Sequence, residues 1–301
     1  ATQGLKSLCL FDIMPTLGIL HIFTIRGWGT LFSAIGMLAW VTGTAKSLCN
    51  QLRGLGLNVH FYKKTYSTQT LEFGGIKAKG YDSVRIMMNP AIFFGALPQT
   101  QRAAVNDIVQ LWCAIWLTVG CSMLGHTGCN MYRKNKAETK AVIRLRAVAR
   151  VRAMAALLGQ LLHGTFGRCV WTPTLHSLCY DVPDAFAIAD LYPGREDSIE
   201  GCQQLARTIL KKCVGVGDRN SETLRRWYAL LGARRRVVPA PKFLVVALRR
   251  QLIQWNIKRA QAVTRAEAVL QLYTDLNGGE PVSGPPLNTY ICVYHPDVDM
   301  R

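Results

Sequence analysis

Hydrophobic and polar residues fall into long separate blocks in the N-terminal half of the chain. Residues 7–25 contain one charged residue and one histidine, Asp12 and His21, residues 27–45 contain neither type, and residues 108–132 contain only His126. A helix needs about 20 apolar residues to cross a bilayer core, so residues 108–132 predict a transmembrane helix and the two earlier runs are shorter candidates. The alternative interpretation is three buried helices of a soluble protein, although such helices rarely lack charge for so long.

Small residues recur within the second apolar run. Gly29, Gly36 and Gly43 are spaced by seven, and Ser33 lies four residues after Gly29. Small residues on one face let a second helix approach closely, which is how helices associate in lipid. The pattern predicts a helix-packing face at these four residues. The first run is weaker because Asp12 and Pro15 oppose a spanning helix, so it lies in the interface or spans with partners.

Between the second and third apolar runs the periodicity changes toward that of strands. The segments LNVHFYKKTY and QTLEFGGIKAKG contain β-branched and aromatic residues, and Gly74-Gly75 fits a two-residue hairpin turn. YDSVRIMM adds a possible third strand. Residues 46–106 are therefore predicted to form a β-rich insert outside the bilayer.

A basic segment follows the third apolar run. Residues 133–152 hold eight Lys and Arg against one Glu, with Leu145, Val148, Val151 and Met154 at helical spacing. This predicts a basic amphipathic helix over 133–168. Its membrane-proximal cations are expected to contact anionic headgroups, with RNA binding as the alternative. These cations are Arg133, Lys134, Lys136 and Lys140.

The remaining sequence predicts a mainly helical soluble domain over 169–278 and an extended tail over 279–301. SETLRRWYALLGA reads as a short amphipathic helix, and a longer pattern runs over 242–276. The capping box at Thr264 and Glu267 predicts a break in that pattern, and Gly278-Gly279 predicts its end. The fold class is thus membrane α-helical, with two to three transmembrane helices in 1–45 and 107–132, a β-rich insert and a helical C-terminal domain.

The net charge and the cysteines indicate in which cellular compartment the protein lies. The 301-residue chain is 50% hydrophobic and carries a formal net charge of +18, and it starts at Ala1, as expected of a processed product. These features favour an imported mitochondrial protein of the inner membrane. The pairs Cys169/Cys179 and Cys202/Cys213 resemble the paired-cysteine hairpins of the intermembrane space, but Pro173 opposes the helix and favours reduced thiols. The disulfide state stays open.

The sequence carries few signs of catalytic chemistry. It lacks a hydrolase elbow, a phosphate loop, a dinucleotide fingerprint and an HExxH motif. Its ten cysteines lie outside zinc spacing, so no metal site is predicted. An enzyme with its own active site is not expected.

Two stretches resemble the cytochrome b membrane anchor of succinate dehydrogenase. IRGWGTLFSA is similar to the entry to that family's first membrane helix, and GHTGCNMYR is similar to its next helix. The resemblance covers about 35 residues and implies that Arg26 contacts a quinone or haem propionate and that His126 ligates haem b. Its cofactors would be haem b and ubiquinone, since imidazole suits iron and Arg offers a fork of donors.

The leading hypothesis is a non-catalytic, accessory membrane subunit of a mitochondrial inner-membrane complex, most plausibly of the respiratory chain and its electron transport. It needs no cofactor, and its partners are other subunits and anionic lipids such as cardiolipin, without nucleic acid. The first alternative is the haem b and quinone anchor. The second is a basic RNA- or ribosome-associated protein.

Overall fold

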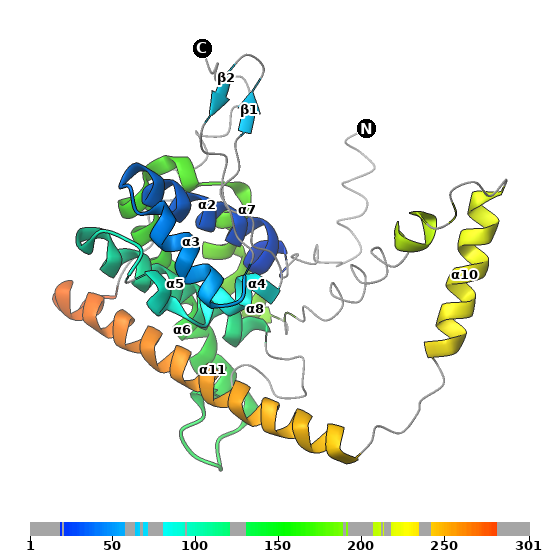
Figure 1. Cartoon of the computed structure of the whole chain (residues 1–301). Coiled ribbons are helices and arrows are strands. Elements are labelled where there is room, and N and C mark those ends of the chain that lie inside the picture. The colour runs from blue at the N-terminus through cyan, green and yellow to red at the C-terminus, as the bar shows by residue number, and fades with distance from the viewer. Residues whose placement is uncertain are drawn as a thin grey trace, which may run out of the picture. The chain divides into compact units, whose positions relative to one another are not determined.

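The structure is a computed structural model and is mainly helical, as the sequence predicts (Figure 1). It describes residues 19, 21–57, 64–66, 69–71, 81–93, 95–120, 131–188, 191, 207–211, 213, 218–234 and 242–281. The chain divides into a first unit, residues 1–192 with 259–301, and a second unit, residues 193–258. The predicted C-terminal domain, 169–278, is therefore shared between the two units.

The described elements are named in chain order. They are the π-helix η2 (His21–Ile25), α2 (Arg26–Val41), α3 (Ala45–Gly54), β1 (Lys64–Tyr66), β2 (Gln69–Leu71), α4 (Tyr81–Met87), the 3-10 helix η3 (Pro90–Phe93), α5 (Gln99–Val119), α6 (Lys140–Phe166), the 3-10 helix η6 (Gly167–Val170), α7 (Pro173–Cys179), α8 (Asp181–Ile188), α10 (Arg219–Arg234) and α11 (Lys242–Leu276).

Helix α5 is the core of the first unit and packs mainly against α6. From Val105 to Val119, only Asp107, Gln110 and Trp116 are not fully buried. Apolar residues on every face of this part of α5 are therefore covered by neighbouring protein. The predicted transmembrane helix over 107–132 overlaps α5, which starts at Gln99 and ends at Val119, and residues 121–130 lie outside the described residues.

One described helix has the length and composition to cross a membrane. It is the continuous stretch His21–Val41, formed by η2 and α2, with a mean hydropathy of 1.3. Of its most apolar window, 56% is buried inside the protein. The buried residues of α2 itself include Trp28, Leu31, Phe32 and Ile35, which form one face of the helix.

The junction of η2 and α2 is fixed by contacts from distant helices. The wider π-helical turn leaves carbonyl groups outside the α-helical ladder, and two of them accept side-chain hydrogen bonds. The Trp112 indole donates to the carbonyl of Phe23 at 3.2 Å, and the Ser83 hydroxyl donates to that of Thr24 at 2.9 Å. Trp112 also packs edge-on against the Phe23 and Trp28 rings.

The predicted β-rich insert over 46–106 is mostly helical. Its described residues form α3, α4, η3 and the start of α5, and only one short antiparallel hairpin of β1 and β2. The segment that was expected to form a third strand forms the helix α4 instead. Its side chains Ile86 and Met87 are buried, at 0% and 1% exposure. Gly74-Gly75 lies outside the described residues.

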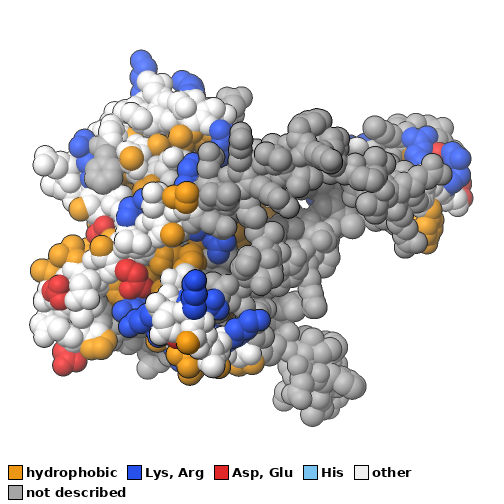
Figure 2. Space-filling model, turned by 90° about the horizontal axis from the view of Figure 1, so that it is seen from below, with side chains coloured by type: hydrophobic (Ala, Val, Ile, Leu, Met, Phe, Trp, Pro, Cys, Tyr) orange, Lys and Arg blue, Asp and Glu red, His pale blue; other side chains and the backbone are white. Residues whose placement is uncertain are grey.

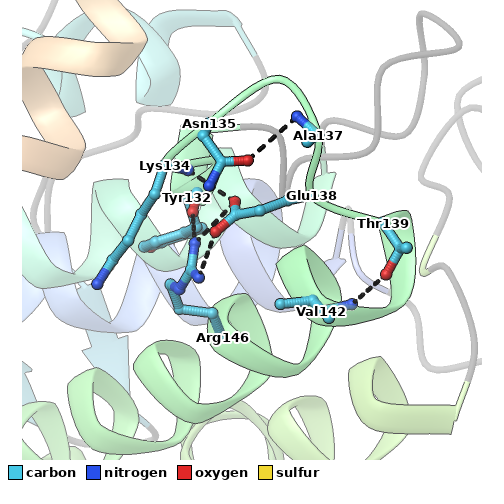
Figure 3. A network of polar contacts seen from close by, with 8 residues as sticks. All are labelled: Tyr132, Lys134, Asn135, Ala137, Glu138, Thr139, Val142 and Arg146. Atoms are coloured by element: carbon cyan, nitrogen blue, oxygen red, sulfur yellow. Dashed lines mark hydrogen bonds and ion pairs between the residues drawn. The ribbon is translucent and has the colours of Figure 1, made fainter.

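Helix α6 is a core helix rather than a surface helix. Ile143, Ala147, Val151 and Met154 are fully buried at helical spacing. Of the four residues predicted to form the apolar face, Leu145 is not buried, since its side chain is 71% exposed. Thr139 caps the start of α6, and its hydroxyl accepts a hydrogen bond from the backbone N–H of Val142 (Figure 3).

Helix α11 runs without a break over the predicted length. The Thr264 hydroxyl donates to the carbonyl of Ala260, one turn earlier, instead of capping a new helix, so the predicted interruption is wrong. The predicted end is confirmed, because Gly278 and Gly279 adopt positive φ values of 70° and 86°. Most of the predicted tail, residues 282–301, lies outside the described residues.

Candidate functional site

A network of polar contacts lies at the start of α6 (Figure 3). We call Tyr132, Lys134, Glu138 and Arg146 the α6 polar cluster. The Arg146 guanidinium donates to both oxygens of Glu138, at 2.8 and 3.2 Å, and to the backbone carbonyl of Tyr132. The backbone N–H of Lys134 donates to Glu138 at 2.8 Å. The cluster thus ties the turn before α6 to the helix itself.

This geometry fixes the charge state of the cluster. The hydrogen bond from Arg146 is the main reason that the pKa of Glu138 falls from 4.5 to about 2, and the N–H of Lys134 adds to it. The pKa of Arg146 is raised by the same hydrogen bond with Glu138. Both side chains are therefore charged at neutral pH and hold the turn closed.

The other arginines of α6 are also used within the first unit. Arg144 donates to the carbonyl of Phe186 at 2.7 Å and lies 5.5 Å from the centre of its ring. Arg152 pairs with Asp184 at 2.9 Å, and Arg150 pairs with Glu267 at 3.4 Å. These cations connect α6 to α8 and α11, so the basic character of this helix serves internal packing.

The predicted headgroup residues are a separate set. Arg133, Lys134, Lys136 and Lys140 are exposed in the turn before α6 and at its first position. Their exposure is compatible with the predicted lipid contact, which nothing in the structure tests.

Helix α11 meets α5 and α6 through partly buried acids. Tyr273 donates to Asp107 at 3.4 Å, and burial raises the pKa of Asp107 and of Glu267. Burial also raises the pKa of Tyr132 to about 12, and its hydroxyl lies 3.3 Å from that of Thr118. Among the described residues, no three His, Cys, Asp or Glu side chains gather in a way that could hold a metal ion.

Only one of the two predicted haem and quinone residues lies in the described part of the structure. Arg26 is exposed at the first position of α2, and its carbonyl accepts a hydrogen bond from Thr30 at 3.1 Å. His126 lies outside the described residues, so its role as a haem ligand stays a prediction.

The predicted small-residue face is divided by the structure. Gly29 and Ser33 are partly exposed on α2, whereas Gly36 is buried. Gly43 lies beyond the end of α2 at φ 72°, so its assignment to the helix face is wrong. The helix stops there because the backbone turns left-handed at this glycine.

Gly27 is the close-contact glycine that the seven-residue pattern misses. A Cβ at this position would lie 2.0 Å from the carbonyl oxygen of Ile22 and 3.2 Å from the Trp112 ring. At Gly29 a Cβ would meet no described atom within 4 Å. One local feature of the sequence points to close packing at Gly27, because this glycine directly precedes Trp28, a large aromatic residue at the start of the helix.

Four cysteines have buried side chains: Cys49, Cys113, Cys179 and Cys213. Cys179 and Cys213 are free thiols, so neither forms the disulfide that the spacing allowed. Burial raises the pKa of the Cys179 thiol. A buried thiol in apolar surroundings is inert.

No family model matches the chain, and no curated protein and no solved structure matches it either.

Proposed function

We propose that this chain is a non-catalytic subunit of a mitochondrial inner-membrane complex, and that α2 attaches its helical unit to the membrane part of that complex. The proposal rests on one observation, the two different faces of α2. One face belongs to the core of the first unit, and the other is open. The mitochondrial and respiratory parts of the proposal rest on the sequence expectations.

The inner face of α2 joins the helix firmly to the first unit. Trp28 and Leu31 are fully buried, and the Trp28 ring lies 5.7 Å from that of Phe32 and 6.0 Å from that of Trp112 on α5. Fully burying one such side chain stabilises a fold by roughly 1.5–3 kcal/mol. The helix therefore cannot leave the unit without unfolding part of its core.

Beyond the exposed Arg26 at its first position, the outer face of α2 is apolar or small. Met37 is 43% exposed, Trp40 is 39% exposed, and Gly29 and Ser33 lie half-open on the preceding turns. A face of this composition suits a helix of another subunit, because small residues allow close approach, or the acyl chains of lipid. Trp40 near the end of the helix is typical of the membrane interface.

The polar contacts between the helices of the first unit agree with a scaffolding role. The arginines of α6 contact α8, α11 and the turn before α6, and these contacts hold helices in place. A rigid helical unit with one open apolar helix face is suited to assembly. Further contacts to anionic lipid are assigned to the exposed Arg133, Lys134, Lys136 and Lys140.

A leucine at position 29 tests the outer face. We expect Gly29→Leu to block assembly into the complex, measured by native gel electrophoresis after mild detergent extraction, while the chain keeps its helical circular dichroism. Gly164→Leu is the matched control, since a Cβ at Gly164 on α6 also meets no described atom within 4 Å. Normal assembly of the Gly29→Leu chain would overturn the role of this face.

A further inference from the structure

The positive charge of the chain is concentrated in the second unit. Residues 193–258 hold fourteen Lys and Arg against five Asp and Glu, which amounts to half of the net charge of +18. In the first unit, α6 directs its arginines to internal partners. Helix α10 in the second unit has four arginines and a single acid, Glu222.

Glu222 does not neutralise this charge. It accepts hydrogen bonds from Arg225 at 2.7 and 2.9 Å and from Arg226 at 2.6 Å, so two guanidinium groups share one carboxylate. The Glu222 side chain is only 16% exposed, whereas that of Arg225 is 77% exposed. The pair leaves positive charge at the open side of the helix.

The same open side of α10 carries large apolar side chains. Leu224 is 55% exposed and Tyr228, one turn later, is 69% exposed. Among the side chains of α10 that the structure describes, the half-buried ones are Glu222, Thr223 and Arg226. Figure 2 shows hydrophobic and basic side chains next to one another at the right-hand end of the molecule, where α10 lies. Among the described side chains of α10, large apolar groups thus lie beside a cation on the exposed side of the helix.

We infer that α10 is a membrane-surface helix that binds an anionic lipid bilayer through Leu224, Tyr228 and Arg225. Helices that lie in the membrane–water interface have an apolar face with aliphatic and aromatic residues and a polar face rich in Arg and Lys. Anionic headgroups complement the excess arginine charge, and the acyl boundary takes up Leu224. RNA could bind the arginines and stack its bases on Tyr228, but it offers no apolar region that would bury Leu224.

This inference is independent of the proposed function, since a helix can lie on a membrane whether or not α2 joins a complex. A local probe keeps the two apart. We replace Tyr228 in the full chain by a fluorescent amino acid and measure its emission and its quenching by acyl-brominated lipid. The control position for the probe is Leu272 on α11. Its side chain is 54% exposed, close to the 55% of Leu224.

The expected result is a blue shift and quenching at position 228, but not at position 272, in phosphatidylcholine vesicles that contain cardiolipin. Arg225→Gln should weaken vesicle binding about fivefold, from roughly 1 kcal/mol per surface cation, and added salt should weaken it further. Leu224→Ser should remove the quenching, while Leu272→Ser should leave it unchanged.

Three results would overturn the inference. One is equal emission at positions 228 and 272 with anionic vesicles. Another is the same response to pure phosphatidylcholine vesicles, which would exclude recognition of anionic lipid. The last is a shift with polyuridylic acid but not with vesicles, which would identify the face as an RNA-binding surface.

Discussion

The indole nitrogen of Trp112 donates a hydrogen bond to the backbone carbonyl of Phe23, 89 residues earlier in the chain, at 3.2 Å. The bond joins the middle of the core helix α5 to the π-helical turn that leads into α2. It satisfies a buried carbonyl that the widened turn removes from the helical ladder. The entry to α2 is therefore set by the core of the first unit.

Gly27 and Gly29 should respond in opposite ways to alanine. Gly27→Ala forces a methyl group against the Ile22 carbonyl and Trp112, so we expect it to lower the free energy of unfolding by about 1–3 kcal/mol. Gly29→Ala fills open space in a helix and should raise it by up to about 1 kcal/mol. Urea unfolding followed by circular dichroism measures both. Equal effects of the two substitutions would contradict the close packing at Gly27.

The α6 polar cluster predicts a loss of stability in acid. The pKa of Glu138 is about 2 in the folded chain against an ordinary 4.5, so its contribution is complete above about pH 4.5 and is lost as the pH falls toward 2. We expect Glu138→Gln to be less stable than the wild type at pH 7 and to approach it below pH 4.5. Urea midpoints across this range give the comparison. A stability difference that does not change with pH would be inconsistent with the lowered pKa.

The partly buried carboxylate of Asp107 predicts the opposite change of stability with pH. Burial raises its pKa above the ordinary 3.8, so the charged carboxylate costs stability at neutral pH, and this cost disappears as the pH falls through the raised value. Asp107→Asn should therefore unfold at a higher urea concentration than the wild type at pH 7 and lose this gain in acid. Asp184→Asn is the control, since the side chain of Asp184 is 71% exposed. A destabilised Asp107→Asn chain would argue against a cost of burial.

Buried thiols predict slow alkylation. Cys179 and Cys213 are free, and the Cys179 thiol is disfavoured as a thiolate by its burial. We expect iodoacetamide to modify both slowly in the native chain and rapidly in urea, as measured by peptide mass spectrometry. Recovery of either cysteine in a disulfide, before any reducing agent is added, would contradict the free-thiol assignment.

Local signals in the sequence predicted the end of α11 correctly. The apolar pattern and Gly278-Gly279 give the length of α11, since a helix former and a left-handed glycine act on their immediate neighbours. The capping box at Thr264 failed for a related reason. A threonine hydroxyl can bond back to the preceding turn as readily as it caps a new helix.

Long-range features could not be read in the same way. A charge-free run such as that of α5 is equally consistent with lipid and with a protein core, and the burial of α5 depends on helices that lie far away in the sequence. The pairing of Arg150 and Arg152 on α6 could not be read from the pattern, because their partners, Glu267 and Asp184, lie far along the chain. Charge patterns show how many cations a helix carries, but their partners depend on the fold.

The most direct test of the central claim is carbonate extraction of mitochondria, followed by native electrophoresis of the detergent-solubilised chain and identification of the proteins that migrate with it. A subunit joined to a membrane complex through α2 stays in the carbonate pellet and migrates well above the size of a monomer, with a constant set of partner proteins. Release into the carbonate supernatant as a monomer would contradict the account.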